Sequence, residues 1–113
     1  MDEFWNDLLL QMKAVESIGD KIERGEAYLE ELNGSLPALN KIINGLFELL
    51  QTPEFGLEIS TDFILQVLND ILYGIENEDA VFLLDVLRYG LLSVFYYIIS
   101  ELQSGGIHEQ TSL

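Results

Sequence analysis

A long apolar stretch near the C-terminus, residues 78–103, constrains the fold of this chain more than any other part of the sequence. On a helical wheel at about 100° per residue, most of its large apolar side chains fall on one broad face. A helix that is apolar on its other sides too is usually central in a bundle. The stretch therefore predicts a core helix that begins after the N-cap Asn77 and stops at Ser104-Gly105-Gly106. Its predicted core face consists of Leu83, Leu84, Leu87, Leu91, Val94, Phe95, Ile98 and Leu102.

The same stretch is interrupted by charges too often to suit a membrane span. Only 12 uncharged residues separate Arg88 from Glu101, whereas a spanning helix needs roughly 20 apolar residues. We therefore expect a core helix and no membrane span.

Residues 79–91 of this stretch read DAVFLLDVLRYGL and resemble a segment of small all-helical proteins of unknown function from Gram-positive bacteria. That segment runs approximately D-x-V-x-L-x-D-x-L-E-Y-E-L. Arg88 and Gly90 depart from the pattern, in which both positions are acidic. The resemblance implies a bacterial helical protein and brings no known activity. The matching residues are Asp79, Val81, Leu83, Asp85, Leu87, Tyr89 and Leu91.

The N-terminal third, residues 1–33, is predicted to form one long helix. Apolar residues recur there every seven positions, which suits packing against one antiparallel neighbour. A bend near Gly19, or a new cap there, stays open because Gly19 and Gly25 each cost about 1 kcal/mol inside a helix. The repeat consists of Leu8, Val15, Ile22 and Leu29, with Phe4, Ile18 and Leu32 in a companion stripe that Gln11 and Gly25 interrupt.

Two shorter helices are predicted over residues 36–50 and 61–75, joined by a loop at 51–60. Pro37 would lie in the first turn of the earlier helix, after a serine cap at Ser35, where proline is tolerated, and Thr52-Pro53 would end the helix. Ser60-Thr61-Asp62 is the expected cap of the later helix. The predicted fold class is all-α: an antiparallel helical bundle of about four helices, two long and two short. We expect a single helical domain of residues 1–104 and a mobile C-terminal tail of residues 105–113.

The charge balance restricts the kinds of partner. Among 113 residues there are 20 acidic and 5 basic ones, which gives a net charge of −15. Such a chain is repelled by nucleic acid and by anionic membrane surfaces, and it favours basic partners. The chain has no cysteine, and its first residues are acidic where a signal peptide is basic. We therefore expect a location in the reducing cytoplasm.

The ionisable residues form no catalytic pattern. The only histidine, His108, lies in the predicted tail, which excludes Ser-His-Asp and Glu-x-x-His arrangements. Glu23, Glu26 and Glu30 would share one face of the first helix, but nearby basic residues favour a solvated, ion-paired face over a cation site. We expect no catalytic residue, no cofactor and no metal, and hence a non-enzymatic protein.

Asp85 is the one acid within an apolar segment, and it has two interpretations. A carboxylate in such surroundings can have a perturbed pKa and a catalytic role. Alternatively, it forms a local ion pair with Arg88 at i+3 on the less buried side of the helix. We favour the ion pair, because no second acid or base is placed to assist a reaction.

The side of the core helix opposite its main face carries the candidate partner-binding residues. These lie within about 80° of one another on the wheel, and tyrosine is enriched at interfaces, although core packing also explains such residues. The first hypothesis is an acidic protein-binding module, chaperone- or adaptor-like, similar in composition to flagellar and type III secretion chaperones. Alternatives are a structural homodimer, with Asp85 and Arg88 paired across the twofold axis, and a ligand-binding bundle. The candidate residues are Phe82, Asp85, Tyr89, Leu92 and Tyr96.

Overall fold

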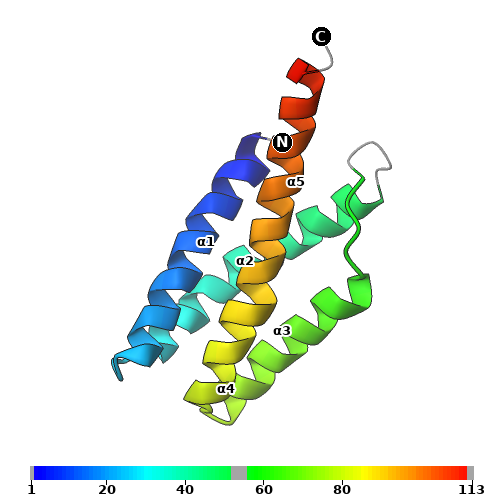
Figure 1. The fold of residues 1–113 in the computed structure, drawn as a ribbon. Coiled ribbons are helices and arrows are strands. Elements are labelled where there is room, and N and C mark those ends of the chain that lie inside the picture. Colours follow the sequence, from blue (N-terminus) through cyan, green and yellow to red (C-terminus); the bar gives the residue numbers. More distant parts are fainter. Residues whose placement is uncertain (1, 52–55, 112–113) are drawn as a thin grey trace.

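The described part of the chain folds into an antiparallel bundle of four helices (Figure 1), which confirms the predicted all-α class. The computed structural model describes residues 2–51 and 56–111, with side chains for residues 3–51 and 56–103. Helix α1 spans Asp2–Glu23, α2 spans Leu29–Leu50 and α3 spans Thr61–Glu76. The final helix is continuous over residues 80–111 and comprises α4 (Ala80–Asp85), a π-helical segment η2 (Val86–Leu91) and α5 (Leu92–Thr111).

The final helix is the central element, as its apolar spacing predicts. Helix α1 packs along one side of it and α3 along another, while α2 packs mainly against α1. The predicted core residues Leu87, Leu91, Phe95 and Ile98 are all buried, which confirms the core face. The other helices contribute Leu8, Val15, Ile18, Leu32, Leu39, Ile42, Ile43, Leu46, Ile64, Val67 and Ile71 to the same core.

The prediction of one helix over residues 1–33 was wrong, because α1 ends at Glu23. Gly25 has a φ of +72°. Its backbone N–H donates to the carbonyl of Ile22 at 3.1 Å, and that of Glu26 donates to Lys21 at 2.8 Å. These two bonds form the Schellman motif, which closes a helix with a glycine in the left-handed conformation. Gly25 is therefore the stop signal of α1 rather than an interruption within it.

Helix α2 begins earlier than predicted and contains Pro37 in its interior. Proline there leaves the carbonyl four residues earlier, on Asn33, without its helical N–H partner. Both Pro37 and Asn33 are exposed, so water can reach that carbonyl. The hydroxyl of Ser35 donates to the carbonyl of Glu31 at 3.0 Å and so belongs to the helix instead of capping it.

The turn between α3 and α4 repeats the geometry of the first turn without a glycine. The backbone N–H of Glu78 donates to Ile75 at 3.2 Å, and that of Asp79 donates to Gly74 at 3.0 Å. Glu78 has a φ of +48°, a conformation that costs a non-glycine residue about 1–2 kcal/mol. The predicted N-cap Asn77 is wrong, because the Asp79 side chain accepts from the Phe82 N–H and caps the final helix.

The cap predicted for α3 is confirmed. The hydroxyl of Ser60 accepts a hydrogen bond from the backbone N–H of Phe63 at 3.3 Å. Residues 56–60 before it form neither helix nor strand, as expected for a loop, whereas the predicted break at Thr52-Pro53 lies outside the described residues.

The π-helical segment adjusts the register of the final helix. The backbone N–H of Leu92 donates to the carbonyl of Leu87, five residues earlier, in place of the four-residue spacing of an α-helix. Leu83, Leu87, Leu91 and Phe95 are buried at a spacing of four residues. In a regular α-helix that spacing drifts by about 40° at each step, so the wider π turn keeps the four side chains on the buried face.

Two glycines let α3 approach the final helix closely. A Cβ atom on Gly74 would lie 2.6 Å from the side chain of Leu83, and one on Gly90 would lie 3.2 Å from Val67. Because neither glycine has a side chain, Leu83 packs directly against the backbone at Gly74 and Val67 packs against the backbone at Gly90. These contacts hold α3 against α4 and η2.

The end of the final helix also differs from the prediction. Ser104-Gly105-Gly106 does not stop it, since α5 continues to Thr111. Helix formation already under way in the preceding turns outweighs the roughly 1 kcal/mol that each glycine costs. Mobility of residues 105–113 stays a prediction.

Residues Ala80–Gln103 have the length and composition of a membrane span, and they are the one such stretch in the part of the chain that the structure describes. The same residues supply much of the core of the bundle. A central core helix and a spanning helix share this composition, so the expected absence of a span stays a prediction.

Truncation of a core leucine tests the assigned core face. Leu91→Ala should lower the free energy of unfolding by about 2–5 kcal/mol, because it opens a cavity in a packed core. Leu72→Ala removes the same atoms from a side chain that is 53% exposed and should cost below about 1 kcal/mol. Urea denaturation followed by circular dichroism measures both, and equal losses would contradict the assignment.

Replacing Glu78 with glycine, which removes the strain of its left-handed backbone conformation, should stabilise the protein. Glu78→Gly should raise the free energy of unfolding by roughly 0.5–1 kcal/mol, since glycine adopts positive φ freely but loses more entropy on folding. Glu78→Gln controls for the lost charge and should leave the strain unchanged. If the glutamine variant gains as much as the glycine variant, electrostatic repulsion and not backbone strain is the cause.

Candidate functional site

An exposed stripe runs along the final helix on the side away from the core. Tyr89 is 76% exposed and Tyr96 is 48% exposed. Ser93 is exposed between these two tyrosines, and Asp85 is exposed about one turn before Tyr89. Because the π turn holds the buried residues at four-residue spacing, it holds these residues in one row as well. We call Asp85, Tyr89, Ser93 and Tyr96 the tyrosine stripe.

The structure brings three of the five predicted partner-binding residues into this stripe: Asp85, Tyr89 and Tyr96. Leu92 is only 6% exposed and belongs to the core, so its predicted exposure was wrong. Phe82 is half-buried and lies edge-on to the ring of Tyr73, with centroids 5.6 Å apart. The prediction used a uniform 100° per residue, whereas η2 changes the rotation between Phe82 and Leu92.

A groove of about 300 Å³ lies beside the stripe, between α1 and the final helix. We call it the α1 groove. Glu16 and Asp20 line it from α1, and Arg88, Leu92 and Tyr96 line it from the final helix. The half-exposed ring of Tyr96 provides most of the apolar surface, since Leu92 is nearly buried, and the carboxylates of Glu16 and Asp20 lie on the opposite wall. The sequence pattern gave no indication of Glu16 or Asp20, because their place beside Tyr96 depends on how α1 packs.

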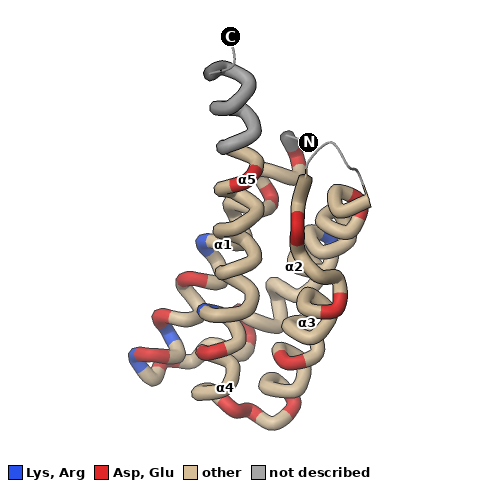
Figure 2. The backbone as a smooth tube through the Cα atoms, turned by 45° about the vertical axis from the view of Figure 1, so that its right-hand side comes forward, with Lys and Arg blue, Asp and Glu red and all other residues tan. Residues whose placement is uncertain are grey.

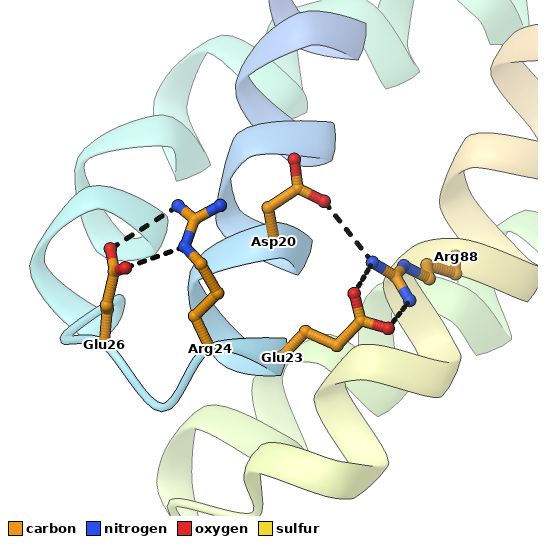
Figure 3. A network of polar contacts seen from close by, with 5 residues as sticks. All are labelled: Asp20, Glu23, Arg24, Glu26 and Arg88. Carbon is orange, nitrogen blue, oxygen red and sulfur yellow. Dashed lines mark hydrogen bonds and ion pairs between the residues drawn. The ribbon is translucent and has the colours of Figure 1, made fainter.

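Arg88 closes one end of the groove through ion pairs with α1 (Figure 3). Its Nη1 and Nη2 atoms each donate to a carboxylate oxygen of Glu23 at 2.9 Å. Nη2 also lies 3.4 Å from Asp20. The side chain passes close to Gly19, where a Cβ would be 3.5 Å from its Nε atom. The predicted pair between Asp85 and Arg88 is therefore wrong, since the guanidinium binds α1 instead.

This arrangement leaves the groove anionic. The hydrogen bond from Arg88 lowers the pKa of Glu23, and the same pairing raises the pKa of Arg88. The groove and its end thus hold three carboxylates against one guanidinium. Glu16 makes no hydrogen bond or ion pair with any residue that the structure describes. Figure 2 shows that acidic residues also lie along every helix of the bundle, whereas basic ones are few.

The three glutamates considered as a cation site do not share a helix face. Glu23 ends α1, Glu26 lies in the turn and Glu30 lies in α2. Glu23 pairs with Arg88, while Glu26 pairs with Arg24 at 2.7 Å and points away from that network (Figure 3). No group of three or more potential ligands of a metal ion occurs within the described part of the chain.

A second groove, of about 320 Å³, flanks the stripe on the side of α3. Phe63, Ser93 and Tyr97 line it, and the hydroxyl of Tyr97 accepts a hydrogen bond from the backbone N–H of Glu58 at 2.9 Å. Helix α3 carries further exposed apolar residues that sequence reasoning missed. They include Leu65 and Leu72, which recur at i and i+7 and are about half exposed, whereas Leu68 and Ile75 pack partly against the core.

Comparison with known protein families, with curated proteins and with solved structures found no significant match. The fold and the site define the class directly: an acidic antiparallel helical bundle that exposes two tyrosines on its central helix. The resemblance of residues 79–91 to helical proteins of Gram-positive bacteria stays a prediction.

The pairing of Glu23 with Arg88 should make stability depend on pH. The folded pKa of Glu23 is lowered, so this carboxylate stabilises the fold above its unfolded pKa of about 4.3. That stabilisation is lost as the pH falls through the lowered folded pKa. The loss of stability caused by Glu23→Gln should therefore be larger at pH 7 than near pH 3, as measured by urea midpoints.

The matched background for this experiment is Arg88→Gln. Once the guanidinium is absent, Glu23→Gln should have nearly the same effect at both pH values. A pH-dependent difference that persists in this background would assign the effect to other charges around Glu23.

Proposed function

We propose that this protein is a non-enzymatic protein-binding module whose recognition surface is the tyrosine stripe. The observation that carries the proposal is the exposure of Tyr89 and Tyr96 on a helix whose other face forms the core. Tyrosine combines a large apolar area with a polar tip and is enriched at interfaces. The α1 groove lies on one side of the stripe and the second groove lies on its α3 side, so the side chains of a partner have a groove to enter on either side.

The chemistry of the surface favours a basic partner. The chain carries a net charge of −15, and unlike charges accelerate association and select partners. Asp85 lies within the stripe, and Glu16 lines the groove beside it. A chaperone- or adaptor-like role in the cytoplasm, in which the module holds a basic segment of another protein, fits this composition.

A homodimer is the second candidate, and the exposed leucines of α3 favour it. Leu65 and Leu72 are both about half exposed, and such apolar surface commonly marks contact sites. Charge opposes this candidate, because each copy carries −15. Pairing of Asp85 with Arg88 across a twofold axis also loses its support, since Glu23 already binds Arg88 through two hydrogen bonds.

The two candidates predict different responses to acidic substitutions. Tyr89→Glu combined with Tyr96→Glu should abolish capture of partner proteins in a pull-down read by mass spectrometry. Leu72→Glu places the same charge on another exposed apolar residue and should leave that capture intact. Light scattering at tens of micromolar should give the mass of a monomer for the unmodified chain.

Two outcomes would contradict the proposal. If the double substitution leaves the captured set unchanged while the protein remains folded, the tyrosine stripe is not the recognition surface. If the unmodified chain is a dimer that Leu72→Glu converts to a monomer, self-association through α3 is the better description.

A further inference from the structure

We infer that the α1 groove receives a basic amphipathic helix of a partner protein, which places an apolar side chain against the ring of Tyr96 and a lysine or arginine beside Glu16. The inference rests on the proposed binding function and specifies the ligand of that surface. It goes beyond the tyrosine stripe, because the recognition of charge is assigned to α1.

The walls of the groove are suited to a helix. Two antiparallel helices, α1 and the final helix, form them. Grooves between helices bind amphipathic helices through anchors at i, i+3, i+4 and i+7. The volume of about 300 Å³ is at the lower limit of pockets that enclose a small ligand. It suits the few anchor side chains of a longer segment that remains partly in solvent.

The two ends of the groove differ in whether their carboxylates are paired. At one end, Glu23 holds Arg88 through two hydrogen bonds, and Asp20 lies within 3.4 Å of the same guanidinium. Glu16 lies one helical turn before Asp20 on α1 and has no partner among the described residues. The guanidinium of Arg88 therefore lies at the Glu23 end of the groove. The unpaired carboxylate of Glu16 lines the part of the groove that Tyr96 also lines.

A basic side chain gains two contacts at the free end of the groove. It can form an ion pair with the carboxylate of Glu16, and its cationic group can lie over the face of the half-exposed Tyr96 ring in a cation–π contact. An acidic segment meets the carboxylates of Glu16 and Asp20, and Arg88, the one cation among the residues that line the groove, is already paired with Glu23 and Asp20. Charge complementarity therefore selects a basic helix over an acidic helix and over a second copy of this chain.

Two synthetic peptides test this inference on the full-length protein. Both are 18-residue helices with one leucine stripe at i, i+3, i+4 and i+7; one has a lysine- and arginine-rich polar face, the other a glutamate-rich one. Fluorescence anisotropy at about 150 mM salt, where screening beyond roughly 8 Å removes diffuse attraction, should show binding of the basic peptide alone. Tyr96→Ala should weaken that binding.

A matched pair of charge reversals separates the groove from general acidity. Glu16→Lys should weaken binding of the basic peptide about tenfold, as expected when a close charge pair becomes repulsive. Glu76→Lys makes the same change of charge at the end of α3, away from the groove, and should change affinity less than threefold. If Glu16→Lys unfolds the chain, Glu16→Gln replaces it with an expected loss of about threefold.

The inference is overturned if both charge reversals weaken binding equally, or if the two peptides bind alike. Either result leaves the proposed function standing, provided that the tyrosine double substitution still removes partner proteins in the pull-down. If the tyrosine double substitution also leaves the set of captured proteins unchanged, the proposed binding function itself is wrong. The two results therefore distinguish failure of the inference from failure of the proposed function.

Discussion

The burial of one face of the final helix is the constraint on which the rest of the structure depends. Every other helix packs against this face or against a helix that does. The π turn at Val86–Leu91 keeps buried side chains aligned at four-residue spacing, and π turns of this kind occur frequently at functional sites. The exposed row with Tyr89 and Tyr96 follows from the same geometry, so core packing and the recognition surface have one structural cause.

The end of the bundle that holds both helix turns is stabilised by charge and by backbone geometry. Arg88 joins the last turns of α1 to the final helix through Glu23. The turn after α1 and the turn after α3 lie at the same end of the bundle (Figure 1). Burial, followed by the nearby charges of Glu78 and Asp79, raises the pKa of Tyr28 at this end. Both turns close with the same pair of backbone bonds. The order of this end orients α1, and with it the acidic wall of the groove.

The sequence predicted what depends on regular periodicity and missed what depends on local backbone geometry. The structure confirmed the cap at Ser60 and most of the predicted core face, although Leu84 is only partly buried. The end of α1 was missed because a glycine costs energy inside a helix and also closes one, and only the hydrogen bonds at Gly25 distinguish the two roles. Leu92 was misplaced because no side-chain pattern reveals a π turn. The partners of Arg88 come from α1, far away in sequence, and no spacing rule reaches that distance.

The π turn also bears on how this chain tolerates changes of length. Such a turn contains one residue more than an α-helical path over the same rise. Loss of one residue from 86–91 would let an uninterrupted α-helix cover the same rise, and the side chains of α5 would keep their direction relative to α4. If the segment instead became α-helical with all six residues retained, α5 would rotate by about 100° relative to α4. Phe95 and Ile98 would then leave the core. The π turn therefore accommodates one residue that a regular helix at this position would not.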